Sequence, residues 1–266
     1  MLQLNGLAIY PILFQDSSGA NTAKVIFPVF KPNVFITLYD IWMGAYTPQD
    51  HTRPTGLSSI HPHWIPIVMV DHDPIPENTL RSAGEAYKII TPTQFGVKEF
   101  ERQGLGHKTY YLPFGIDTTL FKPTIDKTPH VEELIKKTVP FNKMNALEWK
   151  KDDIFLIGTN GANKDPYRKA FDRMFIATQI FLQQNPDAIK DTRFYVHSWM
   201  RMARDIPHLA KALGIDHICR APTDYHMLQS VPLESMASMY NSLDLYLHLS
   251  QGGGFEIPIL EAMTSG

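Results

Sequence analysis

The stretch from Leu247 to Gly266 constrains the fold more than any other part of the chain. It reads LHLSQGGGFEIPILEAMTSG, follows apolar residues that alternate from Leu243, and opens a helix near Pro258. This order predicts a strand, a glycine turn and a helix. Glycines let the backbone approach a ligand closely, and the free N–H groups and dipole at a helix start favour negative charge. The junction is therefore a candidate phosphate seat, although the same order also occurs in doubly wound folds without a ligand there.

Size and charge exclude several classes of protein. A chain of 266 residues, 44% hydrophobic and 20% charged, can bury one large core or two modest ones. The formal net charge of −2 gives no electrostatic case for binding nucleic acid or an anionic membrane. No apolar run approaches the roughly 18 residues that a spanning helix needs, so we expect no integral membrane segment and no signal peptide.

Histidine and cysteine usage argues against metals and disulfides. The 11 histidines are scattered, without the spacing of metal ligands, so no metal is expected. Cys219 is the single cysteine, which excludes an internal disulfide framework. This agrees with a reducing environment, and we expect a cytoplasmic location.

The first half of the chain alternates between predicted strands and helices. Strands are predicted at 33–38, 65–70, 88–90 and 108–112, with helices at 76–86 and 94–103. The first two strands are nearly continuous apolar runs, typical of strands buried on both faces of a parallel sheet. Pro66 is expected at the start of its strand or in an edge strand, because proline cannot donate to a sheet. This alternation indicates a Rossmann-like unit.

The second half repeats the alternation after a segment, 123–153, that we expect to be linker and domain entry with a short helix at 131–138. Strands are predicted at 154–157, 194–197, 217–220 and 243–247, with helices at 166–184, 201–213 and 232–241. The sequence therefore predicts two α/β domains, 1–122 and 123–266.

The C-terminal motif resembles a known signature. GGGFEIPILEAMTSG is similar to EGFG-x-P-x-LEAMA-x-G of the retaining, nucleotide-sugar-dependent glycosyltransferases with the GT-B fold, called glycosyltransferase family 4 or glycosyl transferases group 1. The resemblance implies that Gly253, Gly254 and Phe255 contact the donor and that Glu261 holds its ribose. Gly253 stands where the family has its first glutamate. Glu256, three residues later, is the candidate to replace that carboxylate as a catalytic group.

A second stretch, NKDPYRKAF, resembles the R-x-x-P-x-K-G segment that binds the donor diphosphate in this family. Lys169 matches the lysine. The arginine position falls on Asn163 or Lys164, depending on how one extra residue is aligned, and Lys164 or Arg168 is the candidate to compensate. From spacing alone, Arg168 and Lys169 are also explained as a solvated basic pair near a helix start.

Two segments of the first half carry the same resemblance. His72 in VDHDPIP resembles the strand-end histidine that contacts the donor sugar near its reacting carbon, and it is the second catalytic candidate. A histidine beside two aspartates is otherwise a structural group. The segment PFGIDTTLFKP resembles the element that closes the N-terminal domain, with Phe114 where a polar residue is usual.

The resemblance implies an α/β fold of GT-B type, with two Rossmann-like doubly wound domains facing across a cleft. The first strand and glycine-rich loop of that fold are not recognised, and the chain stops after the LEAM helix, so we expect both domains to be incomplete and the chain to be a fragment.

The implied function is a glycosyltransferase of the hexosyltransferase type. It would move a sugar from a UDP- or GDP-sugar to an unknown sugar, lipid or protein acceptor, with retention, no metal and no other cofactor. Two alternatives stay open: a nucleotide-sugar epimerase or hydrolase of the same fold, and a non-catalytic nucleotide-binding remnant.

Overall fold

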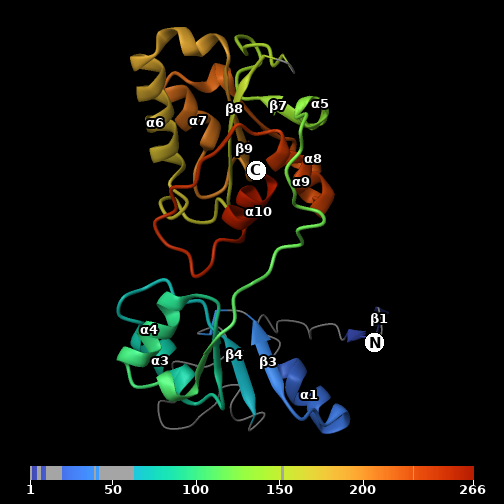
Figure 1. Cartoon of the computed structure of the whole chain (residues 1–266), viewed down its shortest axis with the longest axis vertical. Coiled ribbons are helices and arrows are strands. Elements are labelled where there is room, and N and C mark those ends of the chain that lie inside the picture. Colours follow the sequence, from blue (N-terminus) through green and yellow to red (C-terminus); the bar gives the residue numbers. More distant parts are fainter. Residues whose placement is uncertain are drawn as a thin grey trace. The chain divides into compact units, whose positions relative to one another are not determined.

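The computed structural model of the chain describes residues 2–4, 7–9, 20–38, 40–41, 63–150, 153–229 and 231–266. The chain forms two compact units: Met1–Phe114 with Gly253–Phe255, and Gly115–Gly252 with Glu256–Gly266 (Figure 1). Each has its own sheet and core. The two units are defined by how closely their residues pack together. The domain boundary expected between residues 122 and 123 stays a prediction. None of the helices in the described ranges is long and apolar enough to cross a membrane.

The first unit is built on a parallel four-stranded sheet in the order β3-β4-β5-β6. The strands are β3 (Phe35–Leu38), β4 (Trp64–Ile67), β5 (Ile89–Thr91) and β6 (Thr109–Tyr111), and the helices are α1 (Ala20–Phe30), α3 (Glu77–Gly84) and α4 (Gln94–Arg102). A short antiparallel pair, β1 (Leu2–Leu4) and β2 (Leu7–Ile9), precedes them. Trp64, Ile89 and Phe100 form the centre of the buried core. The predicted parallel β/α alternation is therefore confirmed.

Two expectations about the first strands were wrong. Pro66 lies inside β4, which is flanked by β3 and β5. The sheet tolerates this proline because hydrogen bonds to β5 and the residues just before it are made on both sides of Pro66. The Trp64 carbonyl accepts from the Tyr87 amide (2.9 Å), and the Val68 amide donates to the Ile90 carbonyl (2.8 Å). Ile36 and Leu38 are more than half exposed, so β3 is not buried on both faces; it lies at the edge of its sheet.

The second unit has a five-stranded sheet in the order β11-β8-β9-β10-β7. Its parallel strands are β8 (Phe155–Asn160), β9 (Thr192–His197), β10 (Cys219–Pro222) and β11 (Leu245–Tyr246), and β7 (Thr138–Pro140) runs antiparallel to β10. Its helices are α5 (Thr128–Lys137), α6 (Phe171–Gln184), α7 (Ile206–Ala212), α8 (Asp224–Leu228), α9 (Leu233–Asn241) and α10 (Ile257–Ser265).

The side chains of β9 show how the two faces of this sheet are covered. Phe194 and Val196 pack into one buried cluster with residues of α6 and α7. Tyr195 points to the opposite face, where residues of α5 and α9 complete another cluster. The unit is therefore a three-layer α/β/α arrangement, as expected for a Rossmann-like fold.

The segment expected to be a linker is part of the second unit. It contains α5 and β7, and Val131, Leu134 and Trp149 are buried in the core. The guanidinium of Arg193, a residue only 5% exposed, donates to the Glu148 carbonyl from Nε (3.0 Å) and Nη2 (2.7 Å). The sequence between 140 and 153 is mostly polar. Its attachment to the core by Arg193, a residue of β9, could therefore not be predicted from the segment itself.

Replacing Arg193 by methionine tests this anchor. Arg193 also donates to the carbonyls of Ile189 (3.2 Å) and Thr192 (2.8 Å), so the change leaves buried acceptors without donors. We expect a loss of about 3 kcal/mol in the free energy of unfolding, measured by urea denaturation. Arg173→Met on the exposed face of α6 is the control. An equally small loss in both variants would contradict the anchoring role.

Candidate functional site

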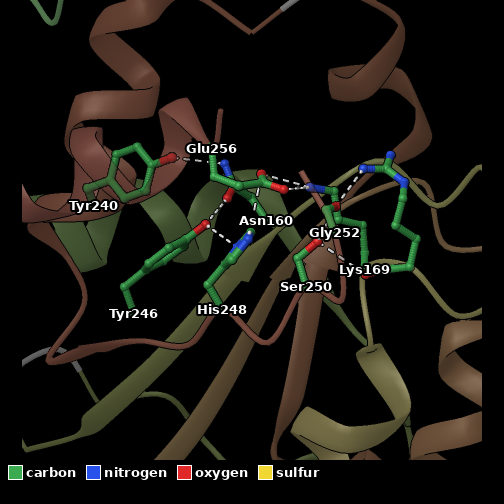
Figure 2. Close-up of polar contacts among 9 residues, drawn as sticks. Asn160, Lys169, Tyr240, Tyr246, His248, Ser250, Gly252 and Glu256 are labelled. Carbon is green, nitrogen blue, oxygen red and sulfur yellow. Dashed lines mark hydrogen bonds and ion pairs between the residues drawn. The ribbon is translucent and has the colours of Figure 1, made fainter. Parts of the chain in front are cut away.

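Two loops of the second unit meet at the carboxyl ends of adjacent parallel strands. One loop follows β8 and the other follows β11, and these strands are paired in the sheet. The Gln251 amide donates to the carbonyl of Arg168 (2.8 Å). The Ser250 hydroxyl lies 3.1 Å from the same oxygen, and 3.0 Å from the Gly252 carbonyl (Figure 2). The carboxyl ends of parallel strands are where open α/β sheets bind ligands.

A nearly buried ion pair joins the two loops. Lys169 Nζ lies 2.7 Å from Oε1 and 2.8 Å from Oε2 of Glu256, and the side chains are 11% and 17% exposed (Figure 2). Glu256 directly precedes α10, which opens at Ile257 and so confirms the helix expected near Pro258. Glu256 is thus the N-cap residue of α10, but its carboxylate makes no capping hydrogen bond and faces the Lys169 ammonium instead.

The loop before α6 determines where Lys169 points. The Oδ1 atom of Asp165 accepts from the amides of Tyr167 (2.8 Å) and Arg168 (2.7 Å), and Ala170 adopts a left-handed backbone with φ of 50°. This turn delays the helix, which begins at Phe171 and not at 166 as expected. Arg168 and Lys169 therefore belong to the loop and not to the first turn of the helix.

Gly161 permits the lysine side chain to pass close to the backbone. A Cβ atom at this position would lie 3.3 Å from Cγ of Lys169, closer than ordinary van der Waals contact. Glycine at 161 thus allows the aliphatic part of Lys169 to pack against the strand end while its ammonium reaches Glu256.

The surroundings keep Glu256 ionised. His248 Nε2 lies 3.5 Å from Oε2 of Glu256, and contact with His248 and with the Lys169 ammonium lowers the pKa of this carboxyl to about 2, against the opposing effect of burial. The site therefore holds an anion supplied by the chain itself. The groups available to bind a negatively charged ligand are the Lys169 ammonium and the backbone N–H groups at the start of α10.

Asn163 and Lys164, the alternatives for the family's arginine, have different surroundings. Asn163 is fully buried; its amide donates to the carbonyls of Trp199 (2.9 Å) and Arg204 (2.8 Å), and its Oδ1 accepts from the Arg204 amide (3.0 Å). These bonds give Asn163 a structural role in holding the loop. Lys164 is exposed. Binding roles for both stay predictions.

Glu261 lies on α10 at the end of a chain of hydrogen bonds. The Tyr240 hydroxyl donates to Oε2 of Glu261 (2.8 Å), Asn160 Nδ2 donates to the Tyr240 oxygen (2.9 Å), and the Tyr246 hydroxyl donates to Oδ1 of Asn160. None of Tyr240, Asn160 and Tyr246 was among the site residues predicted from the sequence. A polar residue ending an apolar strand, as Asn160 does, was the available signal.

The remaining candidates belong to the first unit. His72 follows β4, is largely exposed, and has Nδ1 2.5 Å from Oδ1 of its neighbour Asp71. Gly253, Gly254 and Phe255 group with the same unit, in the segment directly before Glu256. The structure thus brings together Lys169 and Glu256, with Arg168 beside them, and the roles of the other candidates stay predictions.

A cavity of about 330 Å³ opens on the second unit, near the carboxyl ends of β9 and β10. Its lining is Leu134, Lys137, Tyr195, His197, Pro222, His226, Gln229, Val231, Pro232, Ser235 and Met239. The Tyr195 hydroxyl lies 2.6 Å from Nδ1 of His197, and burial lowers the pKa of this histidine to about 4. His197 is thus neutral at physiological pH. Within the part of the chain that the structure describes, no three histidine, cysteine, aspartate or glutamate residues form a group able to hold a metal.

No protein-family model matches the sequence, and no curated protein sequence matches it. Solved structures match it by fold. They include the N-terminal domain of Candida albicans trehalose-6-phosphate phosphatase, with a TM-score of 0.61 at 14% identity over 91% of this chain and 55% of that one. The pneumococcal O-GlcNAc transferase GtfA in complex with UDP and GlcNAc matches with a TM-score of 0.56 at 11% identity, over 92% of this chain and 42% of that one.

A third match is the E. coli structure described as trehalose-6-phosphate bound with UDP-2-fluoro glucose. Its TM-score is 0.59 at 10% identity, over 92% of this chain and 59% of that one. The chain thus spans between two-fifths and three-fifths of the length of these three proteins. The matches confirm the expected fold class, an α/β fold with parallel sheets and the Rossmann-like arrangement of GT-B proteins.

Replacing Glu256 by glutamine tests the ion pair through acid stability. The folded pKa of about 2 lies below the ordinary value of 4.5, so this carboxylate stabilises the fold above about pH 4.5 and less as pH falls toward 2. At neutral pH the contribution is on the order of 3 kcal/mol. We expect wild type to exceed Glu256→Gln in urea stability at pH 6, and the difference to fall by about half at pH 3.

Glu234→Gln, on the exposed side of α9, is the matched control and should show a small difference that varies little with pH. A difference for Glu256→Gln that stays constant from pH 6 to pH 3 would show that the carboxylate is not held by this pair.

Proposed function

We propose that the chain is the nucleotide-sugar-binding part of a glycosyltransferase that uses a UDP- or GDP-sugar as donor. The observation that carries the proposal is the Lys169–Glu256 pair, a nearly buried cation facing an internal carboxylate at the start of α10. A donor diphosphate has the charge to replace that carboxylate on Lys169. The fold shared with structures that contain UDP or UDP-2-fluoro glucose supports the same conclusion.

The leaving diphosphate needs stabilisation of its developing negative charge. In this proposal Lys169 provides it together with Arg168 and the backbone N–H groups of the segment Gly252–Phe255, and Lys164 contributes from the loop. When the diphosphate takes over Lys169, Glu256 is released. Its carboxylate then stabilises the positive charge of the oxocarbenium-like state. For His72, the proposal keeps the contact with the donor sugar that the resemblance in the sequence implies.

The nucleoside part has two supports in the second unit. Glu261 accepts hydrogen bonds from the ribose hydroxyls, as the resemblance implies. The cavity between β9, β10 and α9 has the size and mixed lining of a small-molecule site, and we assign the base to it.

Transfer of a hexose with retention, without a metal or other cofactor, belongs to the proposal and rests on the resemblance in the sequence. A cytoplasmic location rests on the single cysteine. The acceptor, whether sugar, lipid or protein, is not specified by this site.

Calorimetric titration with UDP, GDP, UDP-glucose and GDP-mannose tests the donor class. We expect one nucleotide series to bind, and Lys169→Met to weaken its affinity by about tenfold or more, because a charge-assisted contact is worth roughly 1.5–3 kcal/mol. Lys211→Met, an exposed lysine of α7, should bind like wild type. A folded wild-type protein that binds none of the four ligands would exclude the proposed function.

Glu256→Gln should change affinity in the opposite direction. The glutamine carries no charge to compete for Lys169, so we expect nucleoside diphosphates to bind up to about tenfold more tightly, while sugar transfer becomes slower. Glu234→Gln again serves as the control. Tighter binding with unchanged transfer would remove the catalytic role of Glu256, and weaker binding would contradict the competition.

Product analysis separates the alternatives. Free sugar or an epimer in place of a glycoside would indicate a hydrolase or epimerase. Nucleotide binding without turnover, with turnover restored by Gly253→Glu, would indicate a binding remnant whose missing carboxylate is the one that the resemblance expects at 253.

A further inference from the structure

The hydrogen bonds that lead to Glu261 all point in one direction. Asn160 decides this direction, because its amide has a donor end and an acceptor end. Its Oδ1 accepts from Tyr246, and its Nδ2 donates to the Tyr240 oxygen. The Tyr240 proton is therefore left for Oε2 of Glu261, at 2.8 Å. Figure 2 shows the two tyrosines, one from α9 and one from β11, both directed toward Asn160 at the end of β8.

Burial preserves this arrangement. Tyr240 is 4% exposed and Asn160 is 9% exposed. Burial, with the Glu261 charge as a further cause, raises the pKa of Tyr240 well above its ordinary value, and burial also raises that of Tyr246. Both hydroxyls thus keep their protons over the physiological range and act as donors.

We propose that Tyr240 and Asn160 are positioning residues that fix the Glu261 carboxylate for a pair of adjacent hydroxyl groups on the ligand. The inference rests on the proposed function and specifies its ribose contact. A carboxylate oxygen accepts more than one hydrogen bond, so the Tyr240 bond fixes the plane of the group while leaving acceptor capacity for the ligand. A carboxylate held in advance loses less conformational entropy when a vicinal diol binds.

The test compares UDP with 2′,3′-dideoxy-UDP by calorimetry on wild type and Tyr240→Phe, which removes one hydroxyl and keeps the ring. We expect the variant to lose about five- to tenfold in affinity for UDP and less than twofold for dideoxy-UDP. Ser238→Ala removes another hydroxyl of α9, one that hydrogen-bonds Glu133 (2.6 Å), and should leave both affinities unchanged.

Equal losses for the two ligands, or no loss for either, would overturn the positioning role while leaving the proposed function intact. Absence of UDP binding by folded wild type would overturn the proposed function and this inference with it. If Tyr240→Phe does not fold, Tyr246→Phe replaces it; this change removes the donor that orients Asn160, and a selective loss for UDP is again expected.

Discussion

The candidate site depends on the parallel pairing of β8 with β11. This pairing aligns Leu245 with Ile157 and Tyr246 with Gly158, so two loops that are about 90 residues apart in the chain leave the sheet side by side. The ion pair between Lys169 and Glu256 follows from that alignment. Both partners belong to the second unit, so the ion pair is formed within one compact unit.

Much of the fold could be predicted because short stretches of sequence are enough to indicate its strands and helices. All eight strands predicted from the sequence lie within a few residues of observed parallel strands, and the start of α10 was predicted from its proline. The position of Pro66 and the packing of the segment 123–153 into the core could not be predicted, because both depend on distant partners: the ladder to β5, and the buried guanidinium of Arg193. Neither partner can be identified from the residues around Pro66 or within the segment 123–153.

The site divides in the same way. Lys169, Glu256 and Glu261 could be singled out from motifs, whereas the contacts that each of them makes could not. That Glu256 would neutralise Lys169, and that Tyr240 would bind Glu261, follows from contacts between residues 87 and 21 positions apart. Asn163 illustrates the converse: it stands at a motif position, yet its polar atoms are engaged by the backbone of residues 199–204.

Ala170 links the loop to the core. Its left-handed backbone is unfavourable for alanine by roughly 1 kcal/mol, and the residue is 1% exposed. The next residue, Phe171, is buried among the side chains that α6 shares with β9. The conformation that aims Lys169 is therefore maintained by the packed interior. It follows that this loop should exchange its amide hydrogens and melt together with α6, as one cooperative element with the core, and not as an independently fluctuating surface segment.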